Sequence, residues 1–325
     1  MNMITPLNPV MNNPFEGTFD GTPLDFCVKT DDLYTNASVH KSTEKKAVIK
    51  LDHEGSAEDW WVVGKDYPIK THRKYYDAIE REIIDNMDPN HLQGVTVQTK
   101  SARNGRWGLR DYLFPNVQVP IKTSEGHETT VSLRIVAWSG LDGYTANNYM
   151  LGAIDNFCTN GMVFTQAADK DSAYVKMYKR NTKNFNLSAF AVHLRQSVEL
   201  FYEQAEQYRK MALVPLQQAY GVDFIDALSM SESKRQGIKA LYNNEIVDRG
   251  SNVFALHSAL TNYSSHQNTN VFRTRTTKND VIAETMFKRE EEVAKILTSK
   301  AWHDLMSDSW LHPITRLPRY ATMQL

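Results

Sequence analysis

Two neighbouring stretches in the middle of the chain alternate apolar and polar residues with a period of two. The first covers residues 117–121 and the second residues 131–137. Because side chains on a β-strand point alternately to its two faces, this period is typical of half-buried antiparallel strands. Gly126 lies between the two runs and predicts a hairpin turn. The chain must therefore build at least one antiparallel sheet.

A second hairpin is predicted just upstream. Residues 95–99 and 106–114 form two strand-like runs around Asn104-Gly105, a dipeptide that favours the tight turns of hairpins. Two shorter apolar runs, residues 47–49 and 60–63, predict another strand pair. A helix is expected to begin near Thr71 and to end near Asp88-Pro89.

Helical periodicity dominates the rest of the chain. Residues 147–157 have the spacing of a short helix, and residues 163–178 predict one more strand pair. A long amphipathic helix is expected over residues 186–214, where Pro215 ends or kinks it. Ser229 to Glu232 has the form of a capping box for a helix towards Val247, Ser251 is the expected cap of the next, and a last helix covers residues 278–299.

These elements predict an α+β fold. Its mostly antiparallel sheet has the order β-β-β-α and is backed by a C-terminal helical half. We expect residues 1–24 to form an extended or disordered arm and residues 25–185 a sheet-rich, nucleic-acid-binding part. Residues 186–311 are expected to form a helical part packed on it, and residues 312–325 a tail.

Composition excludes several classes of protein. The formal net charge is −1, so a uniformly basic, histone-like binder is excluded. The charges are nevertheless segregated, with six basic and three acidic residues over 98–135. Two cysteines cannot form a multi-bridge framework, and no apolar run approaches the ~20 residues of a membrane span. We expect a cytoplasmic protein that does not bind a membrane, in the host cell if it is phage-encoded.

Motifs for catalysis and cofactors give little support to an enzyme. The chain has neither a P-loop nor a dinucleotide-binding glycine motif, and its histidines lack zinc-site spacing, so no cofactor or metal is predicted. Asp226, Glu232 and Lys234 superficially match the residues of a metal-dependent nuclease, which stays an alternative. Cys158 has no nearby histidine and is interpreted as a core residue rather than a nucleophile.

Basic residues interleaved with aromatic ones form the one positive pattern. Cations can pair with phosphates, and rings offer stacking faces to the bases of a single strand. Solvated charges beside buried rings would give the same linear pattern, so the hypothesis requires that these residues converge on one groove. The expected nucleic-acid-binding residues are Lys100, Arg103, Arg106, Trp107, Arg110, Tyr112, Arg134, Lys176, Tyr178, Lys179, Arg180 and Lys183.

Four short motifs carry a resemblance to a family. In chain order they are Gly64-Lys65-Asp66-Tyr67, Ser139-Gly140-Leu141-Asp142-Gly143, Ile154-Asp155-Asn156-Phe157-Cys158-Thr159-Asn160-Gly161-Met162 and Lys179-Arg180-Asn181-Thr182. Together they resemble the uncharacterised phage/plasmid-like protein family, a domain of unknown function, over about residues 48–311. This chain has Asn181 where the family pattern has His. The expected architecture is more distantly similar to that of phage single-strand annealing proteins of the RecT and Redβ kind.

The resemblance implies no settled activity, but the architecture and the basic pattern suggest one. We expect a single-stranded DNA-binding and annealing protein of a phage or plasmid, which acts in replication or recombination without nucleotide hydrolysis. It would form a homo-oligomer, as a ring or a filament. The alternative is a non-enzymatic phage interaction, scaffolding or host-takeover protein.

Overall fold

The computed structural model describes residues 14–15, 19–21, 24–34, 40–156, 160–163, 187–266 and 278–307. Its strands are β1 (Phe19–Gly21), β2 (Val28–Tyr34), β3 (Lys41–Leu51), β4 (Ala57–Gly64), β5 (Thr96–Ala102), β6 (Trp107–Lys122), β7 (Glu128–Gly140), β8 (Asn148–Asp155) and β9 (Asn160–Val163). Its helices are α1 (His72–Asn86), α2 (Ser188–Leu213), α3 (Gln218–Ala227), α4 (Glu232–Arg249), α5 (Val253–His266), α6 (Lys278–Leu297) and α7 (Lys300–Met306).

The larger sheet has six strands in the order β1-β5-β6-β7-β8-β9. Strands β5 to β9 are antiparallel to their neighbours, and only β1 pairs in parallel, with β5. The register of β6 against β7 shifts between Phe114 and Gln118. Pro115 lies at this irregularity, where its missing N–H does not interrupt a regular ladder.

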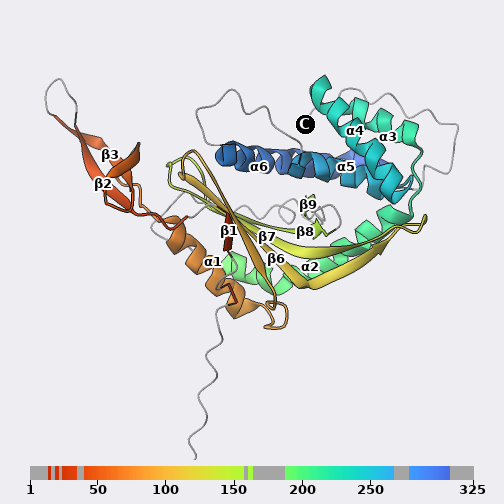
Figure 1. Ribbon diagram of the computed structural model, residues 1–325, viewed down its shortest axis with the longest axis horizontal. Coiled ribbons are helices and arrows are strands. Elements are labelled where there is room, and N and C mark those ends of the chain that lie inside the picture. Colours follow the sequence, from red (N-terminus) through yellow and green to blue (C-terminus); the bar gives the residue numbers. More distant parts are fainter. Residues whose placement is uncertain are drawn as a thin grey trace, which may run out of the picture.

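Helices cover both faces of this sheet. In Figure 1, α1 and α2 lie below the curved sheet, whereas α5 and α6 lie above it. Tyr112 and Ile135 belong to the main hydrophobic core, which α1 and α2 complete. On the opposite face, Leu109 and Trp138 form a smaller cluster with Ala294 of α6. This two-sided coverage leaves few positions of the large sheet open to solvent.

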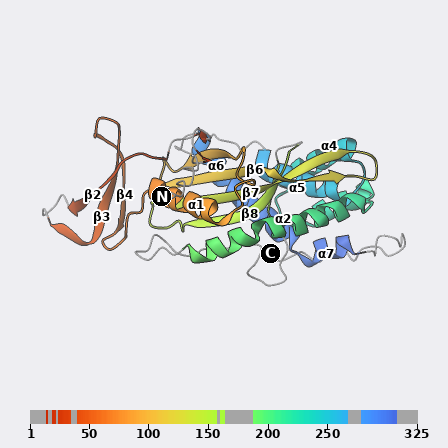
Figure 2. The ribbon, with the colours of Figure 1, turned by 90° about the horizontal axis from the view of Figure 1, so that it is seen from below.

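The smaller sheet, β2-β3-β4, extends away from the helices at one end of the molecule (Figures 1 and 2). One of its faces packs on the body through Val48, Trp61 and Val63, which form a separate cluster with Leu141. We call the opposite face of β2, β3 and β4 the outer face. Three strands with one apolar face are near the minimum for a stable sheet, so this contact anchors it.

The α+β class, the strand pairs predicted within residues 47–63, 95–114 and 117–137, and the C-terminal position of the helices are confirmed. The strand pair predicted over residues 163–178 lies outside the described residues, apart from Val163. The short helix expected over residues 147–157 is wrong, because Asn148–Asp155 form strand β8. Tyr149 and Leu151 are buried on one face of the strand and Met150 on the other. A strand buried on both sides loses its period of two, so its apolar spacing imitates that of a helix.

Details near the chain end and at the helices also differ from expectation. Helix α4 begins at Glu232 after Ser231, whose side chain makes no capping hydrogen bond, so the expected capping box is wrong. Asn252, rather than Ser251, caps α5 by accepting from the backbone N–H of Ala255 at 3.0 Å. The pattern did not predict α3 and α7. Within the expected N-terminal arm, Phe15 is fully buried.

Candidate nucleic-acid interface

The residues expected to bind nucleic acid fall into three separate places. Arg110 and Tyr112 lie under α1, where both contact Glu80. The Arg110 guanidinium lies 2.5 Å from the Glu80 carboxylate, and the Tyr112 hydroxyl donates to it at 2.9 Å. Burial raises the pKa of Glu80, although Arg110 works in the opposite direction. Tyr112 has no exposed surface, so in this structure it offers no stacking face.

Lys100, Trp107 and Arg134 share the face that α6 covers, as their cross-strand partners show. The Arg134 side chain is 3% exposed and donates to Asp111 and to Glu290 of α6. Trp107 is 5% exposed in the cluster beneath α6. Arg134 is therefore part of an internal ion network, and Trp107 is part of the core beneath α6.

Arg103 and Arg106 lie at the joint between the two sheets. Arg106 donates to both oxygens of the Asp59 carboxylate and to the Trp60 carbonyl, and its guanidinium stacks on the Trp61 ring. Arg103 pairs with Asp142 at 2.6 Å. The Arg103 side chain is 42% exposed and the Arg106 side chain 31% exposed. Nearby Tyr144 is 80% exposed.

The joint is fixed by a buried histidine at the start of α1. His72 Nε2 donates to the Gly105 carbonyl at 2.7 Å, and Nδ1 accepts from the Ser139 hydroxyl. The carbonyl can only accept, so this pair of bonds defines a neutral tautomer. Burial lowers the pKa of His72 to about 4. The histidine ties α1 to the β5–β6 turn and to strand β7.

Some sequence-based hypotheses are not tested by these contacts. Lys176, Tyr178, Lys179, Arg180, Lys183 and Cys158 lie outside the described residues. Each of the three residues of the nuclease alternative forms an ion pair with a residue outside that set. Asp226 pairs with Lys239, Lys234 with Glu292, and Glu232 with Arg235. Among the described residues no group of three His, Cys, Asp or Glu side chains could hold a metal ion.

The outer face of the smaller sheet carries an exposed aromatic residue. Trp60 is 58% exposed, and it shares a cross-strand row with Ile49 and Lys29. Side chains in such a row are about 5 Å from their neighbours. The next row contains Asp31, Ala47 and Val62. The ring therefore lies on an open, partly apolar sheet face.

Charge on the outer face is mixed, with lysines on both sides of the apolar centre. Lys29 is on edge strand β2, and Lys45 is on central strand β3 opposite Gly64. Both lysines are exposed. The sequence predicted residues 60–63 as a strand, but it did not predict that one face of this strand is exposed. All four residues from Trp60 to Val63 are apolar, so both faces of this strand are apolar. A three-stranded sheet at the edge of a molecule cannot bury both faces, so this pattern was the available signal for an exposed apolar face.

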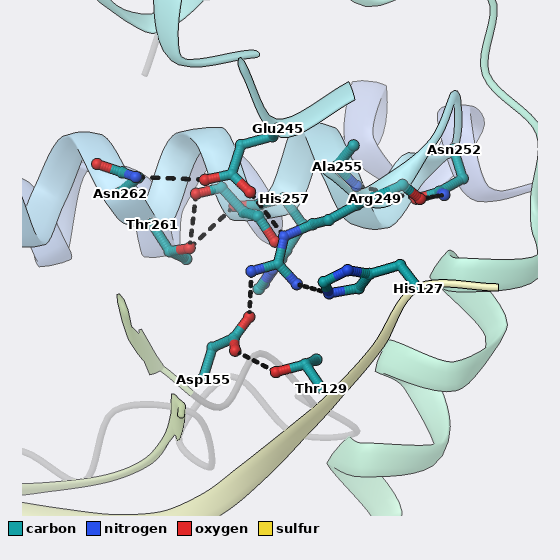
Figure 3. Close-up of polar contacts among 11 residues, drawn as sticks. His127, Thr129, Asp155, Glu245, Arg249, Asn252, Ala255, His257, Thr261 and Asn262 are labelled. Atoms are coloured by element: carbon teal, nitrogen blue, oxygen red, sulfur yellow. Dashed lines mark hydrogen bonds and ion pairs between the residues drawn. The ribbon is translucent and has the colours of Figure 1, made fainter. Parts of the chain in front are cut away.

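A second polar network joins the far end of the larger sheet to the helices (Figure 3). Arg249 of α4 is fully buried and contacts Asp155 of β8 at 2.7 Å and Glu245 at 2.6 Å. Thr129 donates to Asp155 and Asn262 to Glu245, so both carboxylates have further partners. His127 Nε2 lies 3.5 Å from Arg249. This buried network fixes the position of α4 against β8.

The fold and these contacts define a class: an α+β protein with a helix-covered antiparallel sheet and a projecting three-stranded sheet. A family model, described as domain of unknown function DUF932, matches residues 61–292. The chain belongs to this family of uncharacterised function. Neither the curated proteins nor the solved structures include a match. Similarity to the RecT and Redβ proteins therefore stays a prediction.

The family match begins inside β4, so most of the projecting sheet precedes it. Lys29, Lys45 and Trp60 all lie before the matched residues. In the described part of the chain, no helix has both the length and the apolar character that a membrane crossing requires.

Proposed function

We propose that the protein binds single-stranded DNA across the outer face and promotes strand annealing. The observation that carries this proposal is the exposed Trp60 ring in one row with Lys29 of β2, on the same sheet face as Lys45, which lies four residues before Ile49 on the central strand. An aromatic ring stacks on any base, and flanking lysines pair with the phosphates on either side. This combination suits binding without sequence preference.

Annealing follows from how such a face would hold a strand. Stacking and phosphate contacts use the face of a base and the backbone, so the base-pairing edges stay available to a complementary strand. No nucleotide hydrolysis is required. The resemblance to phage and plasmid proteins is consistent with a role in replication or recombination.

The first test separates stacking from charge. Trp60→Ala should weaken binding of a labelled poly-dT oligonucleotide by about 1–3 kcal/mol, the contribution of one stacked base, with little change in salt dependence. Lys29→Ala with Lys45→Ala should instead lower the slope of log affinity against log salt by about 1.4, since each phosphate contact contributes about 0.7. Fluorescence anisotropy at several salt concentrations measures both effects.

Matched variants elsewhere serve as controls. Tyr202→Ala removes an aromatic residue of comparable exposure on α2, and Lys122→Ala removes an exposed lysine at the far end of β6. Neither should change DNA affinity. Asp31→Asn, on the outer face, should strengthen binding because it removes a repulsive charge. A parent protein without affinity for poly-dT at low salt would reject the proposal and favour the protein-interaction alternative.

A further inference from the structure

The first described residues of the chain attach to the larger sheet as a separate unit. Phe15 is fully buried and packs edge-on against Tyr112, with ring centroids 5.6 Å apart. Strand β1 then pairs in parallel with Val97 to Thr99 of β5. We call Phe15 together with β1 the arm. It fills part of the main core and covers the edge of β5.

The arm is joined to the body by a short connection. Only Thr22 and Pro23 separate β1 from Leu24, which is 4% exposed. Leu24 packs so closely on β6 that a Cβ added to Gly108 would lie 2.8 Å from Leu24 Cδ1. The arm and the body are thus anchored independently, on either side of a two-residue link.

We propose that, when copies line up on one single strand of DNA, the arm of each copy pairs with β5 of the next. The surface that receives an arm is identical in every copy, so exchange replaces each contact of the arm by the same contact in a neighbour. This inference rests on the proposed DNA binding. It names a second copy of the chain as the partner of the β5 edge.

Effective concentration explains why DNA would trigger the exchange. A short tether holds the arm near its own β5 at an effective concentration of about millimolar, so free copies at micromolar concentration keep their own arms. Neighbours on a shared strand reach a similar effective concentration, and the two arrangements then compete on equal terms. Exchange then links adjacent copies along the strand.

The short link also fixes the geometry. Three peptide steps from Gly21 to Leu24 span at most about 11 Å, so the receiving β5 must lie beside the donor's Leu24. Arm and β5 edge are different surfaces, which makes the contact head-to-tail. Such contacts close into rings or continue as filaments.

Disulfide trapping tests the exchange directly. Asp20 of β1 and Gln98 of β5 are Cα partners in the parallel ladder, which suits a disulfide. In a Cys27→Ser, Cys158→Ser background, chains with Asp20→Cys are mixed with chains with Gln98→Cys on poly-dT long enough for several copies. We expect a disulfide-linked dimer at about tenfold the yield of a mixture with Lys122→Cys in place of Gln98→Cys, and none on an oligonucleotide that holds one copy.

The remaining outcomes are separable. The double variant Asp20→Cys, Gln98→Cys shows whether the two positions can form a disulfide within one chain. If it does so, and anisotropy shows DNA binding, the absence of a linked dimer above the control overturns the exchange. A double variant that links neither within nor between chains would refute the β1–β5 pairing itself, and the proposal with it. If DNA does not bind, the proposed function fails. The mixture is then oxidised at about 1 mM protein without DNA, where a linked dimer supports exchange and its absence refutes it.

Discussion

At the scale of single residues, position on a strand decides what a side chain can do. Trp60 and Trp61 are consecutive on β4, yet Trp61 is 6% exposed and donates to the Leu141 carbonyl at 2.7 Å, whereas Trp60 is 58% exposed. Strand alternation sends the two rings to opposite faces. Identical residue types therefore act as a core residue and a candidate ligand-binding residue.

The buried His72 makes stability depend on pH. Its pKa is about 4 in the folded protein, against 6.5 in an unfolded chain. Below pH 6.5 the unfolded chain binds a proton that the folded protein does not, so stability is complete above this pH and is lost as the pH falls towards 4. A drop to about pH 5 should cost roughly 2 kcal/mol through this residue. Urea unfolding at both pH values measures the loss.

Two substitutions assign this loss to His72. His72→Gln should be less stable at neutral pH, because it disturbs the bonds to Ser139 and Gly105, yet it should lose less stability on acidification. His53 is exposed on the loop after β3, and His53→Gln should keep the full pH dependence of the parent. An unchanged pH dependence in His72→Gln would contradict the assignment. His257, whose pKa burial lowers to about 3, contributes in the same direction.

At the scale of elements, the β6–β7 hairpin is held by its tip. Glu125 accepts from the backbone N–H of Ser251 at 2.9 Å, immediately after Gly250 at the end of α4. Gly250 has a φ of +81°, and a Cβ there would overlap the Glu125 carboxylate. The turn between α4 and α5 thus needs glycine both for its left-handed backbone and for the close approach of the hairpin.

Gly250→Ala should therefore lower the free energy of unfolding by more than the roughly 1 kcal/mol that the left-handed backbone alone costs. Gly126→Ala is the matched control, since Gly126 has a φ of +91° and nothing within 4 Å of an added Cβ. Adding Glu125→Ala to Gly250→Ala should remove the overlap, so the two changes should cost less together than the sum of the single changes. Strict additivity in denaturant unfolding would show that the overlap is relieved in another way.

At the scale of the whole molecule, one ion network connects segments far apart in the chain. Arg134 of β7 binds Asp111 of β6 and Glu290 of α6, 156 positions away. The network lies between the large sheet and the helical half. Glu290 can reach Arg134 only because α6, which follows α2 to α5 in the chain, lies across the larger sheet (Figure 1).

Arg134→Met should destabilise the protein by about 3–5 kcal/mol, because it leaves two carboxylates buried without their cation. Replacing all three residues, by Arg134→Met, Asp111→Leu and Glu290→Leu, should restore most of the lost stability, since apolar packing can substitute for a buried ion network. Urea unfolding of the two variants checks this. A triple variant less stable than Arg134→Met would show that the network contributes more than charge compensation.

The sequence by itself determined the strands with a clear period of two, the Asn104-Gly105 turn and the long amphipathic α2, because each depends on residues close together in the chain. It also located the basic residues. Only the tertiary structure decided that Arg110, Tyr112, Trp107 and Arg134 are covered, since this depends on α1 and α6 packing from distant parts of the chain. The same packing leaves the outer face uncovered around Trp60, because every helix of the described chain packs on the larger sheet or on another helix.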